Sequence, residues 1–271
     1  SGATPGVIQV VDITDPSGVM ILGEPVEMNG FTLQQCQMEE RDGVLRVVSS
    51  IRTHLPVVET FTVTAQSTLE PLGSLTMTLP ESEMMHGATF DGTRLYVVLE
   101  ESLDTVTIVD LHDPAQPVQG GVLGRARTVQ QLVPRGDRVF ALGFDEAAGQ
   151  LSLSLFDVSD VGTPALRDSE TWGVPWWTEG TPTDVVPSAP TEMALQVVDG
   201  SGLLILSYAG WEDTGYHSGV ELFSFTPDTL EPRGHMPHHG FALRTFLHND
   251  RLWAVSDERV ESYNVLDPDS P

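Results

Sequence analysis

The chain has 271 residues, 40% of them hydrophobic, and its 39 acidic and 13 basic residues give a formal net charge of −26 at pH 7. This charge excludes nucleic acid as an expected partner, because binding to phosphates depends on Lys and Arg. No apolar run approaches the roughly 20 residues of a transmembrane helix, so we expect no membrane span. All 13 basic residues are Arg, which favours a prokaryotic, bacterial source.

The first element expected along the chain is the strand in "VVDITDP", Val10 to Pro16, which ends in a turn. Asp bonds the backbone two residues on, and Pro fixes φ and ends the ladder. The pattern returns in "IVDLHDP", "LFDVSDV" and "SYNVLDP". With Asp12 as the reference, which we call the marker, equivalent markers with a period of about 48 residues are Thr62, Asp110, Asp157, Ser224 and Asn264.

Two further features repeat in the same phase. Eleven residues after the marker stand Gly23, Gly73 and Gly121, with Asp168 in the fourth copy. Upstream of each marker, a turn pair opens an apolar strand, as in "RDGVLRVV", "FDGTRLYVV" and "PRGDRVFAL". Asp-Gly between alternating runs predicts a tight hairpin, because Gly accepts positive φ. Each repeat therefore predicts four antiparallel strands.

Four-stranded units that repeat every 40 to 50 residues predict an all-β fold, the β-propeller, in which the sheets are called blades. We find no convincing helical periodicity, and a β-helix would have shorter rungs. We expect four full blades, at about residues 30–80, 84–125, 126–173 and 191–236, with partial blades at both ends. Residues 1–271 are then one propeller domain or the C-terminal part of a larger propeller.

The strands at the two ends do not add up to one blade. "GVIQVVDITDP" predicts a third strand and "MILGEPVEM" a fourth, whereas residues 241–267 predict strands one to three. The third strand is then present twice. We expect another segment or a partner chain to complete the propeller, because open sheet edges invite aggregation.

"VVDITDPSGVMILGE", "TVTIVDLHDPAQPVQGGVLG" and "LSLSLFDVSDVGTPALRD" resemble secreted bacterial and archaeal proteins with a C-terminal β-propeller domain, which are related to LVIVD-repeat propellers. The resemblance implies an extracellular, cell-surface or periplasmic location and a protein or surface partner. Because proteins of this kind have no settled biochemical activity, the resemblance identifies no catalytic residues in this sequence.

The fourth repeat is longer by about twenty residues, which form a Trp- and Pro-rich insertion at 171–190. Aromatic side chains at such a place can grip a ligand or partner. The alternative is a small satellite core under the loop. The candidate contact residues are Trp172, Trp176 and Trp177.

Histidine and methionine gather in "EMMHG" and "HMPHHG", both expected at the start of a blade's first strand. If these strands meet at the channel mouth, imidazole and thioether groups would suit copper. The alternative is that the two groups lie far apart. The candidate ligands are His86, His238, His239, Met85 and Met236.

No cofactor is required by any motif. The Asp pairs at the turns could offer carboxylates to calcium, but they lack the spacing of a calcium loop, and turn formation already explains them. The only cysteine, Cys36, excludes an internal disulfide, and its alternating stretch "LQQCQM" predicts a small buried residue.

No nucleophile elbow, zinc helix, phosphate loop or Cys-x-x-Cys pair is present in the sequence. The leading interpretation is a non-enzymatic extracellular or surface propeller that serves as a structural or interaction module. The alternatives are a metal- or ligand-binding propeller that uses the His/Met residues, and a hydrolase or lyase acting on polysaccharide. A polysaccharide hydrolase would need two carboxylates at a suitable separation, and among 39 acidic residues such a pair always occurs by chance.

Overall fold

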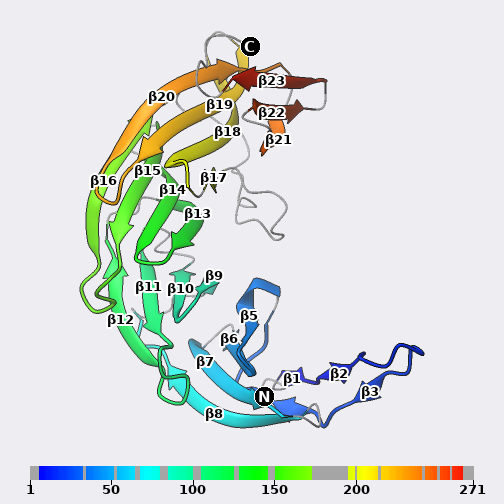
Figure 1. Cartoon of the computed structure of the whole chain (residues 1–271). Helices are drawn as coiled ribbons and strands as arrows, with labels where there is room; N and C mark the ends of the chain where they lie inside the picture. Colours follow the sequence, from blue (N-terminus) through cyan, green and yellow to red (C-terminus); the bar gives the residue numbers. More distant parts are fainter. Residues whose placement is uncertain are drawn as a thin grey trace. The chain divides into compact units, whose positions relative to one another are not determined.

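The computed structural model describes residues 6–32, 35–51, 54–64, 68–79, 85–99, 105–124, 128–145, 150–172, 195–198, 200–212, 215–239, 242–248, 251–256 and 258–264. The chain divides into two compact units. Unit 1 contains residues 1–123 with 161–163, and unit 2 contains residues 124–160 with 164–271. Within the described ranges both units are built from β-strands, and the one helical element is the short 3-10 helix η1 (Gln35–Gln37) (Figure 1).

Unit 1 begins with two antiparallel chain segments that we call the N-terminal ribbon. The first segment contains β1 (Val7–Ile8) and β2 (Val11–Asp12). The second contains β3 (Ile21–Leu22) and β4 (Val26–Glu27). β1 pairs with β4, and β2 pairs with β3.

Two four-stranded sheets follow in unit 1, and each runs as an antiparallel meander in chain order. Sheet 1 consists of β5 (Met38–Arg41), β6 (Val44–Ile51), β7 (His54–Val63) and β8 (Leu69–Thr76). Sheet 2 consists of β9 (Met85–Asp91), β10 (Arg94–Leu99), β11 (Val106–Asp110) and β12 (Val118–Leu123).

Unit 2 repeats the same meander. Sheet 3 consists of β13 (Thr128–Arg135), β14 (Arg138–Asp145), β15 (Gln150–Asp157) and β16 (Ala165–Trp172). Sheet 4 consists of β17 (Leu195–Val198), β18 (Leu203–Glu212), β19 (Gly215–Phe225) and β20 (Leu230–Pro237). Sheet 5 has three strands in the described ranges, β21 (Ala242–His248), β22 (Arg251–Ser256) and β23 (Val260–Asn264).

The predicted fold class is therefore confirmed: four full four-stranded sheets lie between partial ones. The hairpins between first and second strands also form where the sequence predicts them. In sheet 1, Asp42 (φ 53°) and Gly43 (φ 76°) both have positive φ, which is the requirement of a two-residue hairpin turn.

The marker residues lie at or next to the C-terminal ends of third strands, as the repeat phase predicts. Asp110 ends β11 and Asp157 ends β15. Each Asp marker accepts a backbone hydrogen bond two residues on, and the partner of Asp157 is the N–H of Ser159 at 2.9 Å. The carboxylate therefore holds the turn in place of a ladder hydrogen bond.

The repeated glycine lies at a β-bulge where the fourth strand slips by one residue against the third. Such a slip occurs in all four complete sheets, and in sheet 1 it brings Thr60 opposite Gly73. A Cβ on Gly73 would lie 2.5 Å from the carbonyl oxygen of Pro114, in the turn between β11 and β12. Gly73 therefore lets the next sheet's turn approach, and Thr60 Oγ1 donates to the same Pro114 oxygen at 2.6 Å.

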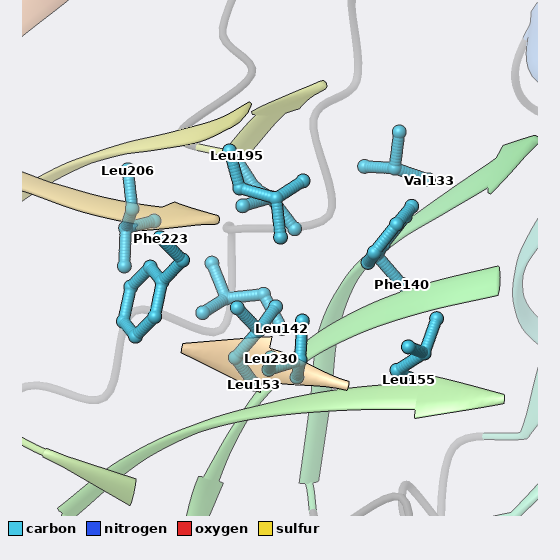
Figure 2. Close-up of a cluster of buried hydrophobic side chains, with 10 residues drawn as sticks. Val133, Phe140, Leu142, Leu153, Leu155, Leu195, Leu206, Phe223 and Leu230 are labelled. Atoms are coloured by element: carbon cyan, nitrogen blue, oxygen red, sulfur yellow. The ribbon is translucent and has the colours of Figure 1, made fainter. Parts of the chain in front are cut away.

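Neighbouring sheets pack face to face through apolar side chains. Sheets 3 and 4 share one buried cluster (Figure 2), and Phe140 meets Phe225 edge to face with ring centroids 4.9 Å apart. The cluster's buried residues are Val133, Phe140, Leu142, Leu153, Leu155, Leu195, Leu204, Leu206, Phe223 and Leu230.

In the third strand of a sheet, successive side chains point to opposite faces, one toward the preceding sheet and the next toward the following sheet. In sheet 4, Phe223 precedes the marker directly and packs on sheet 3, whereas Leu222 packs with sheet 5. In sheet 2, Val109 precedes the marker and packs with Val48 and Val58 of sheet 1. The residue before the marker therefore faces the preceding sheet, as the period-two alternation of a strand requires.

Two local predictions were wrong. Cys36 is exposed, because η1 interrupts the alternation that predicted its burial. Met236 lies in β20, the fourth strand of sheet 4, because the extended pairing runs on from Leu230 to Pro237, so "HMPHHG" does not start a first strand. β16 ends at Trp172, within the predicted third blade, and most of the predicted insertion at 171–190 lies outside the described residues.

Candidate functional site

The predicted histidines of unit 2 surround one carboxylate. His238 and His239 follow β20, and Glu261 lies near the start of β23. His238 Nδ1 contacts Glu261 Oε2, and Tyr263 donates its hydroxyl to the same oxygen at 3.0 Å. His239 Nδ1 and an Arg259 guanidinium nitrogen lie 3.7 and 3.6 Å from Glu261 Oε1.

The electrostatics of this group favour an ionised Glu261. Burial opposes its ionisation, but the hydrogen bond from Tyr263 and the interaction with His238 outweigh burial and lower the pKa of Glu261. Burial and the bond to Glu261 raise the pKa of Tyr263. The side chain of His238 is fully buried, so the group joins the segment after β20 to β23 rather than presenting His238 to a ligand.

The other predicted metal ligands are divided between the two units. Met85 and His86 belong to β9 of unit 1, whereas Met236 belongs to unit 2, where it is fully buried among Val220 and Leu222. Within the described ranges, no group of three or more His, Cys, Asp or Glu could hold a metal ion. A copper site formed by both groups stays a prediction.

The aromatic candidates fall at or beyond the edge of the described residues. Trp172 ends β16, and Trp176 and Trp177 lie outside the described residues. A ligand or partner contact by these side chains stays a prediction.

The Asp pairs of the turns bind backbone groups. Asp12 and Asp15 accept from the N–H groups of Thr14 and Ser17 at 2.9 and 2.8 Å. Hydrogen bonds from the Thr14 and Ser17 side chains, and then from their backbones, lower the pKa of each carboxyl group. These contacts account for the Asp pairs as turn residues, and calcium at them stays a prediction.

One feature that the motif analysis missed is the apolar surface of the N-terminal ribbon. One side of the ribbon packs on sheet 1, where Ile8, Val10 and Val26 join the cluster of Met28 and Phe61. The rest of the ribbon is exposed. Its exposed large apolar side chains are Val7, Val11, Ile13, Val19, Met20, Ile21 and Leu22.

Equivalent positions of the other sheets show that two of these exposures are unusual. Val11 stands directly before the marker and is 40% exposed, whereas its five equivalents are at most 5% exposed. Ile13 stands directly after the marker and is 72% exposed, whereas Leu111 and Val158 are fully buried. The five equivalents of Val11 are Phe61, Val109, Phe156, Phe223 and Tyr263. The residues before and after the marker are apolar in every repeat, so the sequence itself carries no signal of this difference in exposure.

The repeated four-stranded antiparallel sheets define a β-propeller. Residues 8–267 match the β-propeller domain family, and the chain belongs to this family. The uncharacterized protein MJ1554 of Methanocaldococcus jannaschii is 30% identical over 155 residues, which make up 56% of this chain. The match spans 24% of the length of that relative.

Among solved structures, one with a TM-score of 0.50 supports the fold alone. A hypothetical selenium-binding protein from Sulfolobus tokodaii is similar with a TM-score of 0.50 and 9% identity, over 100% of this chain and 70% of that chain. The periplasmic gluconolactonase PpgL of Pseudomonas aeruginosa has a TM-score of 0.49 and 12% identity, over 97% and 74%. No helix in the described part of the chain is long and apolar enough to cross a membrane.

Proposed function

We propose that this chain is a non-enzymatic interaction module whose N-terminal ribbon binds a protein partner. The observation that carries the proposal is the apolar surface of the ribbon. Among the described residues, seven of the fifteen exposed large apolar side chains lie between Val7 and Leu22. Exposed apolar side chains concentrated in one segment indicate an interaction site, whereas single exposed apolar residues are ordinary.

The polar groups described above support the same function. Glu261 is occupied by His238 and Tyr263, and the Asp markers bind their own turns. These groups therefore serve the fold. Propellers host enzymes and binding platforms alike, so the ribbon and not the fold supports the choice. An extracellular, cell-surface or periplasmic setting belongs to the proposal through the family resemblance.

Affinity capture from an extract of the native organism tests the proposal. The baits are the wild-type chain, a double variant with Val11→Asp and Ile13→Asp, and a control with Val118→Asp. Val118 is 57% exposed on β12, away from the ribbon. We expect one protein, identified by mass spectrometry, to be retained by the wild type and the control and lost from the double variant. Equal capture by all three baits would overturn the proposal.

A further inference from the structure

We propose that the N-terminal ribbon is the outer half of a four-stranded sheet and that its partner supplies the inner half as a two-stranded antiparallel β-hairpin. This inference rests on the proposed function and names the chemistry of the partner. The hairpin would stand to the ribbon as β9–β10 stand to β11–β12.

The ribbon has the features of strands three and four. Asp12 ends β2 and accepts from the N–H of Thr14, as the other Asp markers do in their turns. The N–H of Gly23 donates to the carbonyl of Val10 at 2.9 Å. Gly23 and Val10 stand in the same relation to Asp12 as Gly73 and Thr60 stand to Thr62, where sheet 1 has its bulge.

The exposed face of the ribbon is the face that other third strands bury. In sheet 2, Val109 and Leu111 flank the marker and are covered by Leu95 and Val97 of their own sheet, together with residues of sheet 1. Val11 and Ile13 hold these positions in the ribbon and are exposed. Within the described residues, these positions of the ribbon have neither a second strand on the edge of β2, with the apolar residues that it carries, nor a preceding sheet to pack on.

Hydrogen bonds fix the register of the missing strand. In every complete sheet, the N–H after the marker donates to a carbonyl in the turn between the first and second strands. The four bonds, of 2.7 to 3.0 Å, are Val63 to Gly43, Leu111 to Thr93, Val158 to Asp137 and Phe225 to Gly202. The incoming hairpin would offer the same carbonyl to the N–H of Ile13, which is strand addition through main-chain hydrogen bonds.

Charge adds a preference at one position. Where the marker of a complete sheet is Asp, the residue opposite it on the second strand is Arg: Arg94 faces Asp110, and Arg138 faces Asp157. An Arg138 nitrogen lies 3.0 Å from the Asp157 carboxylate. A strand with Arg opposite Asp12 therefore fits the edge of β2 better than one with Asp or Glu.

The hairpin comes from outside the described strands of the chain. Each second strand in the described part of the chain already pairs with its own third strand, from β6 with β7 to β22 with β23. A second copy of the chain would have to break one of these pairings to supply the hairpin. The occupant is therefore a propeller-type hairpin of another polypeptide segment.

A synthetic peptide of residues 128–145 is the probe, because it contains β13 and β14 with Arg138 at the required position. Its binding to the full chain is followed by fluorescence anisotropy. We expect Ile13→Asp in the full chain to weaken binding at least tenfold and Val118→Asp to change it less than about threefold. Val118 is a control outside the ribbon, since it is exposed on β12 of sheet 2. A peptide with Arg138→Asp is expected to bind at least tenfold more weakly.

Three results would overturn the inference: equal losses for Ile13→Asp and Val118→Asp, which indicate non-specific binding; self-association of the chain that blocks the peptide; or no binding. Because a free peptide can fail to fold, we also test a fusion protein. In this fusion, residues 128–145 are placed ahead of Gly6 and joined to it through residues 146–149. We expect its melting temperature to rise by about 4 °C or more, and no rise contradicts the inference. If native capture depends on the ribbon while the peptide and the fusion protein fail, the proposed function stands and only the hairpin is wrong.

Discussion

Gly73 shows how a missing side chain positions one sheet against the next. A Cβ at this position would meet the carbonyl oxygens of Pro114 and Ala115 at 2.5 and 2.8 Å, and both belong to backbone. We therefore expect Gly73→Ala to lower the free energy of unfolding by about 2 kcal/mol, the usual cost of overpacking. Denaturant unfolding measures this loss. The control is Gly124→Ala, where nothing lies within 4 Å, and an equal loss there would contradict the packing argument.

Asp157 makes the stability of sheet 3 depend on pH. Hydrogen bonds from the Arg167 side chain and from Ser159 hold its pKa well below the usual value. A carboxyl group with a lowered folded pKa contributes stability above its unfolded pKa, about 3.9, and loses that contribution as pH falls through the folded pKa. We expect Asp157→Asn to be less stable than wild type at pH 7, and the gap to shrink below about pH 4.

The matched control for this pH dependence is Asp228→Asn. Asp228 lies 3.7 and 3.6 Å from nitrogens of Arg138 and Arg167, but its side chain is 66% exposed. Exposed pairs contribute little, so the control should follow the wild type at each pH. Chemical unfolding at pH 7 and pH 3 measures both gaps. A gap for Asp157→Asn that stays constant with pH would show that the ionised carboxylate is not its source.

His238 and His239, which follow β20, contact β23 through the carboxylate of Glu261. Glu261→Ala removes the carboxylate that meets buried His238 and accepts from Tyr263. We expect a loss of about 2 kcal/mol in the free energy of unfolding, because removing one partner leaves a buried polar group without compensation. Thermal unfolding measures the loss. Glu258→Ala, at an exposed position two residues after Ser256, should stay within about 0.5 kcal/mol of wild type.

At the scale of elements, turn chemistry predicted more than side-chain composition did. Asp110 and Asp157 predicted the ends of β11 and β15. In both places the Asp side chain accepts the backbone hydrogen bond of the turn, and the strand ends at that turn. The position of Met236 was wrong, because the boundary between a fourth strand and the next first strand depends on pairing with β19. Cys36 was wrong for a similar reason, since η1 interrupts an alternation too short to define a strand.

At the scale of the whole molecule, the period predicted the number of complete sheets but not the candidate interface. The repeat phase predicts that the strands around Asp12 and Leu22 are a third and a fourth strand. The sequence does not show that Val11 and Ile13 are exposed, because Val and Ile are residue types that β-strands commonly bury. Only comparison with Val109 and Leu111, whose burial comes from the neighbouring strands, makes the exposure of the ribbon informative.

The central claim is that the N-terminal ribbon is the binding surface. Hydrogen exchange followed by mass spectrometry, on the chain alone and on the chain bound to its captured partner, tests it most directly. We expect the backbone amides from Val7 to Ile13 to exchange at least tenfold more slowly in the complex than in the free chain. Amides of β15, already paired on both sides within sheet 3, should not change. A complex in which protection appears elsewhere while the Val7 to Ile13 amides exchange as in the free chain would contradict the account.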